Sequence, residues 1–68
     1  MKLTIDIEQE DDGRWIAEVL DLPGVLAYGQ SRAEAVARVQ ALAFRVLADR
    51  LEHGESDPEL MSVSFLAA

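Results

Sequence analysis

The chain has 68 residues, no cysteine and a single histidine, and its formal net charge is −7 from thirteen acidic and six basic residues. This size fits one domain, and the absence of cysteine excludes disulfides and thiolate metal sites. The acidic balance repels phosphate backbones and suits a basic protein partner, so we expect no direct binding of nucleic acid. No apolar run approaches the roughly 18 to 20 residues of a membrane span, and acidic residues come too early for a secretory signal; both indicate a cytoplasmic protein.

The first half of the chain is predicted to form three antiparallel strands joined by tight turns. Residues 2–9 alternate apolar and polar side chains, as a strand covered on one face does. Asp12-Gly13 favours a hairpin that leads into a return strand over residues 14–20. Pro23-Gly24 favours a type II turn, because Pro fixes φ at its second position and Gly tolerates positive φ at the third. A third strand is then expected over residues 25–29.

The same alternation assigns faces to these strands. The face toward the core is expected to carry Leu3, Ile5, Ile7, Trp15, Ala17 and Val19. The opposite face is expected to lie in water and to carry Thr4, Asp6, Glu8, Ser62 and Ser64.

The second half of the chain is predicted to be one long helix followed by a last strand. Ser31 and Glu34 form a capping-box pattern, which places the helix over residues 32–52 with Gly54 beyond its end. The inward stripe of this helix is expected to be Ala35, Val36, Val39, Leu42, Ala43, Val46, Leu47 and Arg50. Alternation over residues 61–66 predicts a fourth strand. The fold class is therefore α+β in the order β-β-β-α-β, a three-stranded antiparallel meander plus a fourth strand, with the helix on one sheet face.

A flank of the helix is more apolar than a solvated flank needs to be. It holds Ala37, Ala41, Phe44 and Ala48. Because a chain of this length buries a small core, we expect it to form a homo-oligomer, a dimer or larger, through this flank or through an open edge strand.

No residue pattern indicates catalysis or a cofactor. Asp6, Glu8 and Glu18 can share a sheet face, and clustered carboxylates bind Mg²⁺, but alternating acids on the wet face of a strand are ordinary. We therefore expect neither a metal site nor an enzyme.

Four segments of the chain resemble the HicB family of antitoxins. They are Asp12-Gly13-Arg14-Trp15-Ile16-Ala17-Glu18-Val19, Asp21-Leu22-Pro23-Gly24-Val25, Tyr28-Gly29 and Ser31-Arg32-Ala33-Glu34-Ala35. The family pattern is a hairpin return strand, a D-L-P-G turn and a G-x-S/T-x-x-E-A helix start; Leu20 stands where many members carry Pro. The resemblance implies a partial RNase H-like fold and the neutralisation of HicA, a small basic toxin that cleaves mRNA.

Many HicB proteins also carry a C-terminal DNA-binding domain. This chain is expected to be a single domain over residues 1–68 without that addition, which puts transcriptional autoregulation in doubt.

An acidic cover would be attracted to the RNA-binding face of a basic toxin and would block it. The residues expected to contact such a partner are Asp11, Asp12, Trp15, Asp21, Leu22, Pro23 and Tyr28. The alternative function is a stand-alone nuclease-like, RNA-binding or small-ligand-binding domain with a carboxylate metal site at Asp6 and Glu8.

Overall fold

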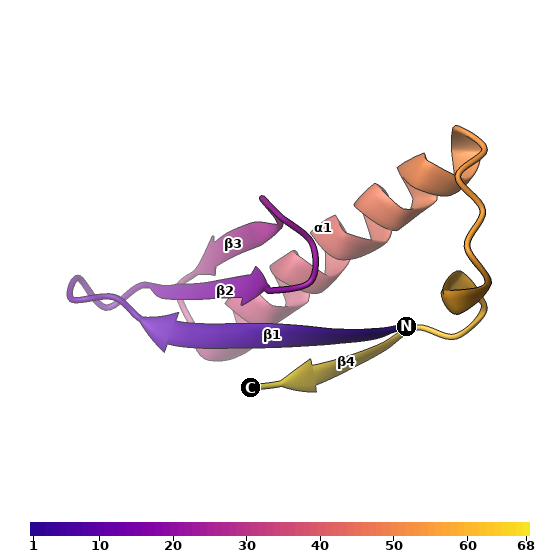
Figure 1. Ribbon diagram of the computed structural model, residues 1–68. Coiled ribbons are helices and arrows are strands. Elements are labelled where there is room, and N and C mark those ends of the chain that lie inside the picture. The colour runs from indigo at the N-terminus through magenta and orange to yellow at the C-terminus, as the bar shows by residue number, and fades with distance from the viewer.

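A computed structural model describes all of residues 1–68 and contains four strands, one long helix and one short 3₁₀ helix (Figure 1). The elements in chain order are β1 (Lys2–Gln9), β2 (Trp15–Val19), β3 (Leu26–Gly29), α1 (Arg32–Glu52), η1 (Pro58–Met61) and β4 (Ser64–Ala67). The predicted α+β class and the order β-β-β-α-β are confirmed. Although α1 has 21 residues, it is not apolar enough to cross a membrane.

The four strands form one mixed sheet in the order β3-β2-β1-β4. β1 and β3 both pair with β2 in antiparallel fashion, which confirms the predicted meander. β4 pairs with β1 in parallel, with Leu3 opposite Phe65. The direction of β4 follows from the helix, because a helix about 30 Å long carries the chain back along the sheet before β4 begins.

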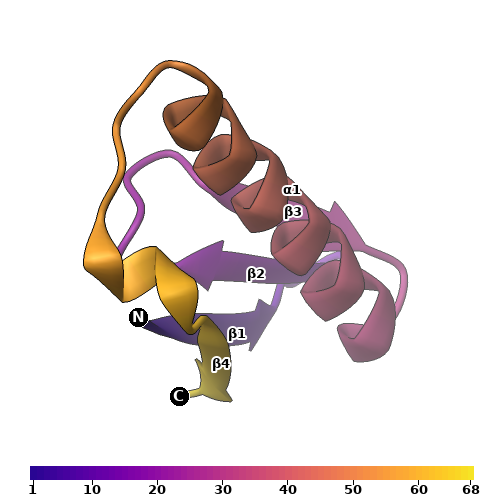
Figure 2. The same ribbon diagram turned by 90° about the vertical axis from the view of Figure 1, so that its right-hand side faces the viewer.

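The core lies between one face of the sheet and α1 (Figure 2). Strand alternation places Leu3 and Ile5 of β1 next to Ala17 and Val19 of β2 on this face, and all four are buried. The helix contributes its own buried stripe at three- and four-residue spacing, made of Ala35, Val39, Ala43 and Leu47. The predicted core face of β2 is therefore correct, with Trp15 half-buried at its margin.

The start of α1 follows the predicted cap, with one difference. The Ser31 side chain accepts a hydrogen bond from the Glu34 N–H at 3.1 Å. The Glu34 carboxylate accepts from the Gln30 N–H at 3.1 Å, one residue before the cap that a capping box would use. At the other end Gly54 has φ +80°, and the Glu55 N–H donates to the Arg50 carbonyl. The predicted helix bounds, residues 32–52, are confirmed.

The beginning of the last strand was predicted wrongly. Met61 was expected on the strand, but it ends η1 and is 90% exposed. The cause is local: the Asp57 side chain accepts from the Glu59 N–H, and Pro58 has a φ suited to the first position of a helical turn. This turn delays β4 until Ser64. Ser62 therefore lies outside the sheet, whereas Phe65 does face the core side, in register with Leu3.

Candidate partner-binding surfaces

The acidic tip of the β1–β2 hairpin is held by bonds within the chain. Gly13 takes a positive φ of +91°, which closes the turn, and the Glu10 N–H donates to the Arg14 carbonyl at 2.7 Å. One Asp12 oxygen accepts the Arg14 N–H at 3.0 Å, and the other lies 2.8 Å from Arg14 Nε. Asp11 and Asp12 are both exposed here, but only Asp12 has a cationic partner.

The Arg14 side chain links this tip to the sheet. Its guanidinium lies over the ring of Tyr28, 4.7 Å from the ring centroid, in a cation–π arrangement. Tyr28 is in β3, opposite Ile16, and its ring remains partly exposed on the face of the sheet that α1 does not cover. Asp12, Arg14 and Tyr28 therefore form one connected surface group.

Arg14 holds the pKa of Asp12 below its ordinary value, first by the backbone hydrogen bond from its N–H and then by the side-chain bond and charge. Since the pKa is lower in the folded state, the resulting stabilisation is present above the unfolded-state pKa and is lost as the pH falls through the folded-state value. We expect Arg14→Ala to raise the Asp12 pKa toward its ordinary value, as measured by NMR titration of the side-chain carboxyl. Lys2→Ala, which removes a cation elsewhere on the sheet, is the control. An unchanged Asp12 pKa in Arg14→Ala would contradict the assigned cause.

The D-L-P-G turn lies at the opposite end of β2. The Val25 N–H donates to the Leu22 carbonyl at 3.1 Å, and Gly24 has φ +81°, as the predicted type II turn requires. One carboxylate oxygen of Asp21 accepts the Thr4 N–H at 2.7 Å, so Asp21 closes the end of the β1–β2 ladder. Pro23 is exposed.

Two of the residues expected to contact a partner need correction. Leu22 is only 2% exposed and packs in the core, because the turn folds its side chain under the sheet end. Trp15 packs against the core from the helix-covered side of β2. The other expected residues, Asp11, Asp12, Asp21, Pro23 and Tyr28, are exposed.

The structure does not bring those exposed residues together. Asp11, Asp12 and Tyr28 lie at the hairpin end of β2, and Asp21 and Pro23 lie at its other end. The five residues of β2 span about 16 Å between them. A partner that touches both groups must therefore cover the sheet face that joins them.

That joining surface, which we call the open face, is the side of the sheet away from α1. Register pairs place on it Lys2, Thr4, Asp6 and Glu8 of β1, Ile16 and Glu18 of β2, Leu26 and Tyr28 of β3, and Ser64 and Leu66 of β4, with Leu20 directly after β2. Leu20, Leu26, Tyr28 and Leu66 are exposed apolar or aromatic side chains. The expectation of a polar face in water was incomplete: no element covers the face, yet much of it is apolar. The sequence signal for this was the apolar residues Ile16 in β2 and Leu20 directly after it, which alternate with the core residues and therefore point outward.

The acidic residues of the open face are adjacent. Asp6 is directly opposite Glu18, and Glu8 follows Asp6 on the same side of β1. Like charges in opposite positions of neighbouring strands repel each other, so this arrangement favours a cation brought from outside. No group of three or more acidic, histidine or cysteine side chains is placed to hold a metal ion.

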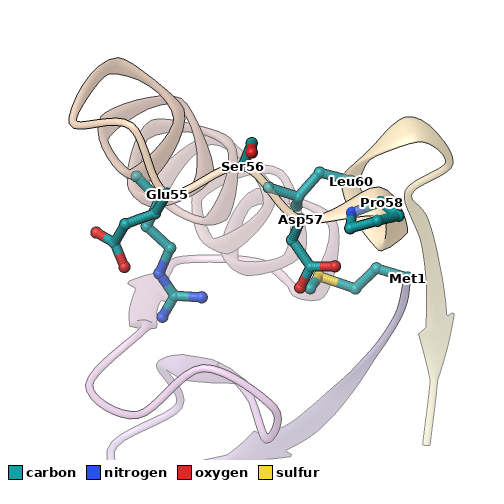
Figure 3. A pocket seen from close by; sticks show the side chains of 7 residues that line it. Met1, Glu55, Ser56, Asp57, Pro58 and Leu60 are labelled. Carbon is teal, nitrogen blue, oxygen red and sulfur yellow. The ribbon is translucent and has the colours of Figure 1, made fainter.

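The surface has several hollows, and the lining of one of about 280 Å³ includes Asp21 and Leu22, two of the residues expected to contact a partner. One of about 350 Å³ lies between the end of α1 and η1 and is lined by Met1, Arg50, Glu55, Ser56, Asp57, Pro58 and Leu60 (Figure 3). Its charged side chains have both signs, and its walls come from Met1, the end of α1, η1 and the loop that connects α1 to η1. The Met1 amino group is held by the Glu59 and Ser62 carbonyls. None of the residues expected to contact a partner lines this hollow.

The flank expected to mediate self-association is on the surface of α1. Ala37, Ala41, Phe44 and Ala48 are all exposed, and Phe44 exposes 53% of its surface. Only Phe44 among them contacts another aromatic side chain, Phe65 of β4.

Comparison of the chain with protein-family models, with curated proteins and with solved structures found no match in any of the three. The resemblance to the HicB family therefore depends on the motifs in the sequence, and the function is argued from the surfaces described above.

Proposed function

We propose that this domain is a HicB-like, antitoxin-type binding protein. It neutralises a small basic mRNA-cleaving toxin of the HicA type by covering the RNA-binding face of that toxin. The observation that carries the proposal is the open face, where apolar side chains surround the adjacent carboxylates of Asp6, Glu8 and Glu18. A chain of net charge −7 that leaves such a face uncovered suits a cationic protein surface.

Two physical effects support this choice of partner. Burial of the exposed apolar side chains supplies affinity, because each square ångström of apolar surface removed from water contributes about 25 cal/mol. A lysine or arginine placed between Asp6 and Glu18 would offset the repulsion of two carboxylates that face each other across β1 and β2. RNA offers neither effect, since its phosphates would be repelled.

The motif residues have roles that fit this surface. The Asp12–Arg14–Tyr28 group borders the open face at the hairpin end, and Asp21 and Pro23 border it at the other end. The alternative requires a carboxylate metal site at Asp6 and Glu8, but although Glu18 lies opposite Asp6, no three such side chains form a group that could hold a metal ion. No observation favours it over a binding protein.

The test is calorimetry of this chain against a purified small basic toxin of the HicA type encoded beside it, with RNA cleavage by the toxin as the second readout. We expect tight binding and loss of cleavage. The double variant Asp6→Lys/Glu18→Lys is expected to slow association about tenfold and to reduce its salt dependence, because charges at an interface act mainly on the encounter rate.

The matched control is Glu52→Lys/Glu55→Lys, which makes the same charge change at exposed positions near the end of α1. It is expected to bind as the unchanged chain does. Absence of binding, or continued RNA cleavage in the complex, would refute the proposal. RNA cleavage by this chain alone on addition of Mg²⁺ would favour the nuclease-like alternative instead.

A further inference from the structure

The helix layer does not extend over β4. α1 packs mainly on β3 and β2 and touches β1 at the edge of its footprint, as the view along the molecule also shows (Figure 2). Ala67 of β4 is in register with the buried Ile5 and faces the same side, yet Ala67 is exposed. Apart from the contact of Phe44 with Phe65, the core side of the sheet therefore lacks a cover over its last strand.

Apolar side chains surround this uncovered strip. The rings of Phe44 and Phe65 meet edge to face, with centroids 5.4 Å apart. Beside them runs a groove of about 280 Å³ between α1 and the segment that leads into β4. It is lined only by apolar side chains, those of Phe44, Leu47, Ala48, Leu51, Leu60 and Val63.

The two edges of the sheet differ in their freedom to pair. On the β3 edge, Arg38 Nη1 donates to the Tyr28 carbonyl at 3.0 Å, so a charged side chain already uses part of that edge. On the β4 edge, the Ser64 N–H donates to the Met1 carbonyl and the Ala68 N–H to the Ile5 carbonyl of β1, so alternation turns the backbone groups of Phe65 and Ala67 outward. Residues 60–68 carry no charged side chain that would discourage pairing.

We propose that the occupant of the β4 edge is a second copy of this chain, paired antiparallel through β4 about a two-fold axis at Leu66. In this register the outward N–H and C=O groups of Phe65 bond to those of Ala67 in the second copy, so all four outward groups of each strand are satisfied. The large Phe65 side chain then lies beside the small Ala67 of the second copy. Phe44 and the groove next to it approach their counterparts across the axis.

The exposed area agrees with what a stable dimer needs. Phe44, Leu51, Leu66 and Met61 expose 53%, 50%, 65% and 90% of their surfaces. At roughly 170 Å² for each side chain this is on the order of 400 Å² of apolar surface, with Leu66 on the open face of β4 and the other three outside it. A stable interface buries about 800 Å² per partner, of which somewhat more than half is apolar.

This pairing is independent of the proposed antitoxin function. The two-fold axis stands perpendicular to the joined sheet, so both helices lie on one side and both open faces lie on the other. The surface with Asp6, Glu8 and Glu18 stays free in each copy.

The test uses the absence of cysteine from the chain. Leu66 would face Leu66 of the second copy as a non-hydrogen-bonded pair, with Cα atoms about 4.5 Å apart, within the range of about 4.4 to 6.8 Å that a disulfide spans. Leu66→Cys is therefore expected to form a covalent dimer quantitatively under mild oxidation. Leu26→Cys, on the β3 edge, is the matched control and is expected to stay uncrosslinked. Crosslinking of Leu26→Cys but not of Leu66→Cys would overturn the proposal.

A second measurement changes side chains of α1, which take no part in the backbone hydrogen bonds of the sheet. Light scattering coupled to size exclusion is expected to show a dimer for the unchanged chain and a dissociation constant raised at least about tenfold for Phe44→Glu. Ala37→Glu, on the same exposed flank of α1 but away from β4, is expected to remain dimeric. A monomeric unchanged chain, or dissociation by Ala37→Glu rather than Phe44→Glu, would refute pairing through β4.

Discussion

Gly29→Ala is expected to lower the free energy of unfolding by about 3 kcal/mol. A Cβ on Gly29 would lie 2.5 Å from the backbone nitrogen of Ala35 and 3.0 Å from its Cα. These atoms belong to the backbone at the start of α1, which the Ser31 cap holds in place. Relief of the clash therefore requires a shift of the backbone of β3 or of α1. Gly29 lets β3 and α1 approach to this distance. The measurement is urea unfolding followed by circular dichroism at a fixed protein concentration.

Gly13→Ala is the control for Gly29→Ala. Gly13 has a positive φ, but a Cβ there would have no atom within 4 Å, so the cost is conformational only, about 1 kcal/mol. Equal losses of unfolding free energy in Gly29→Ala and Gly13→Ala would contradict the close approach of β3 and α1. Because a chain of this length has about 3 to 10 kcal/mol of total stability, Gly29→Ala is expected to remove between about a third and all of the free energy of unfolding.

Leu3→Ala is expected to cost about 3 kcal/mol of unfolding free energy. Leu3 is fully buried on β1, the strand that pairs with both β2 and β4, so the cavity would open at the centre of the sheet. The surrounding side chains come from strands on both sides and from α1, and they cannot all collapse into the space. Urea unfolding monitored by Trp15 fluorescence measures the loss.

Leu20→Ala makes the same chemical change on the open face, where Leu20 is 55% exposed. It is expected to change stability by less than about 0.5 kcal/mol. Equal losses for Leu3→Ala and Leu20→Ala would mean that the open face is packed in the isolated chain. A small stability effect together with weaker toxin binding in Leu20→Ala would agree with the proposed role of that face.

Short-range patterns predicted most of the elements. The strand over residues 2–9 and the helix over residues 32–52 have the bounds expected from alternation and capping, because both signals depend on neighbours within four residues. The turn at Pro23-Gly24 follows from the φ preferences of its two residues. The last strand was placed too early, since the Asp57-Pro58 pair stabilises a helical turn that competes with alternation over residues 61–63.

The candidate surfaces were predicted less completely than the elements. Alternation with the core residues Trp15, Ala17 and Val19 turns Ile16 and Leu20 outward, but the strand pairing decides that they lie near Leu26, Tyr28 and the carboxylates of β1. Exposure of Leu22 could not be read from the motif, because its burial depends on how the turn folds against β1 and α1. The hairpin group with Asp12 and Tyr28 is likewise separated from the turn with Asp21 and Pro23, because β2 lies between them.

The sequence by itself determined the element order, the core face of each of the first two strands and the start and end of the helix, because these depend on local periodicity, caps and turns. Tertiary structure decided that β4 runs parallel to β1 at an edge that α1 contacts through Phe44 but does not cover, and that the open face combines apolar and acidic side chains. Both outcomes depend on which strands become neighbours and how far one helix extends over the sheet. Those are contacts between residues far apart in the chain, and no local pattern encodes them.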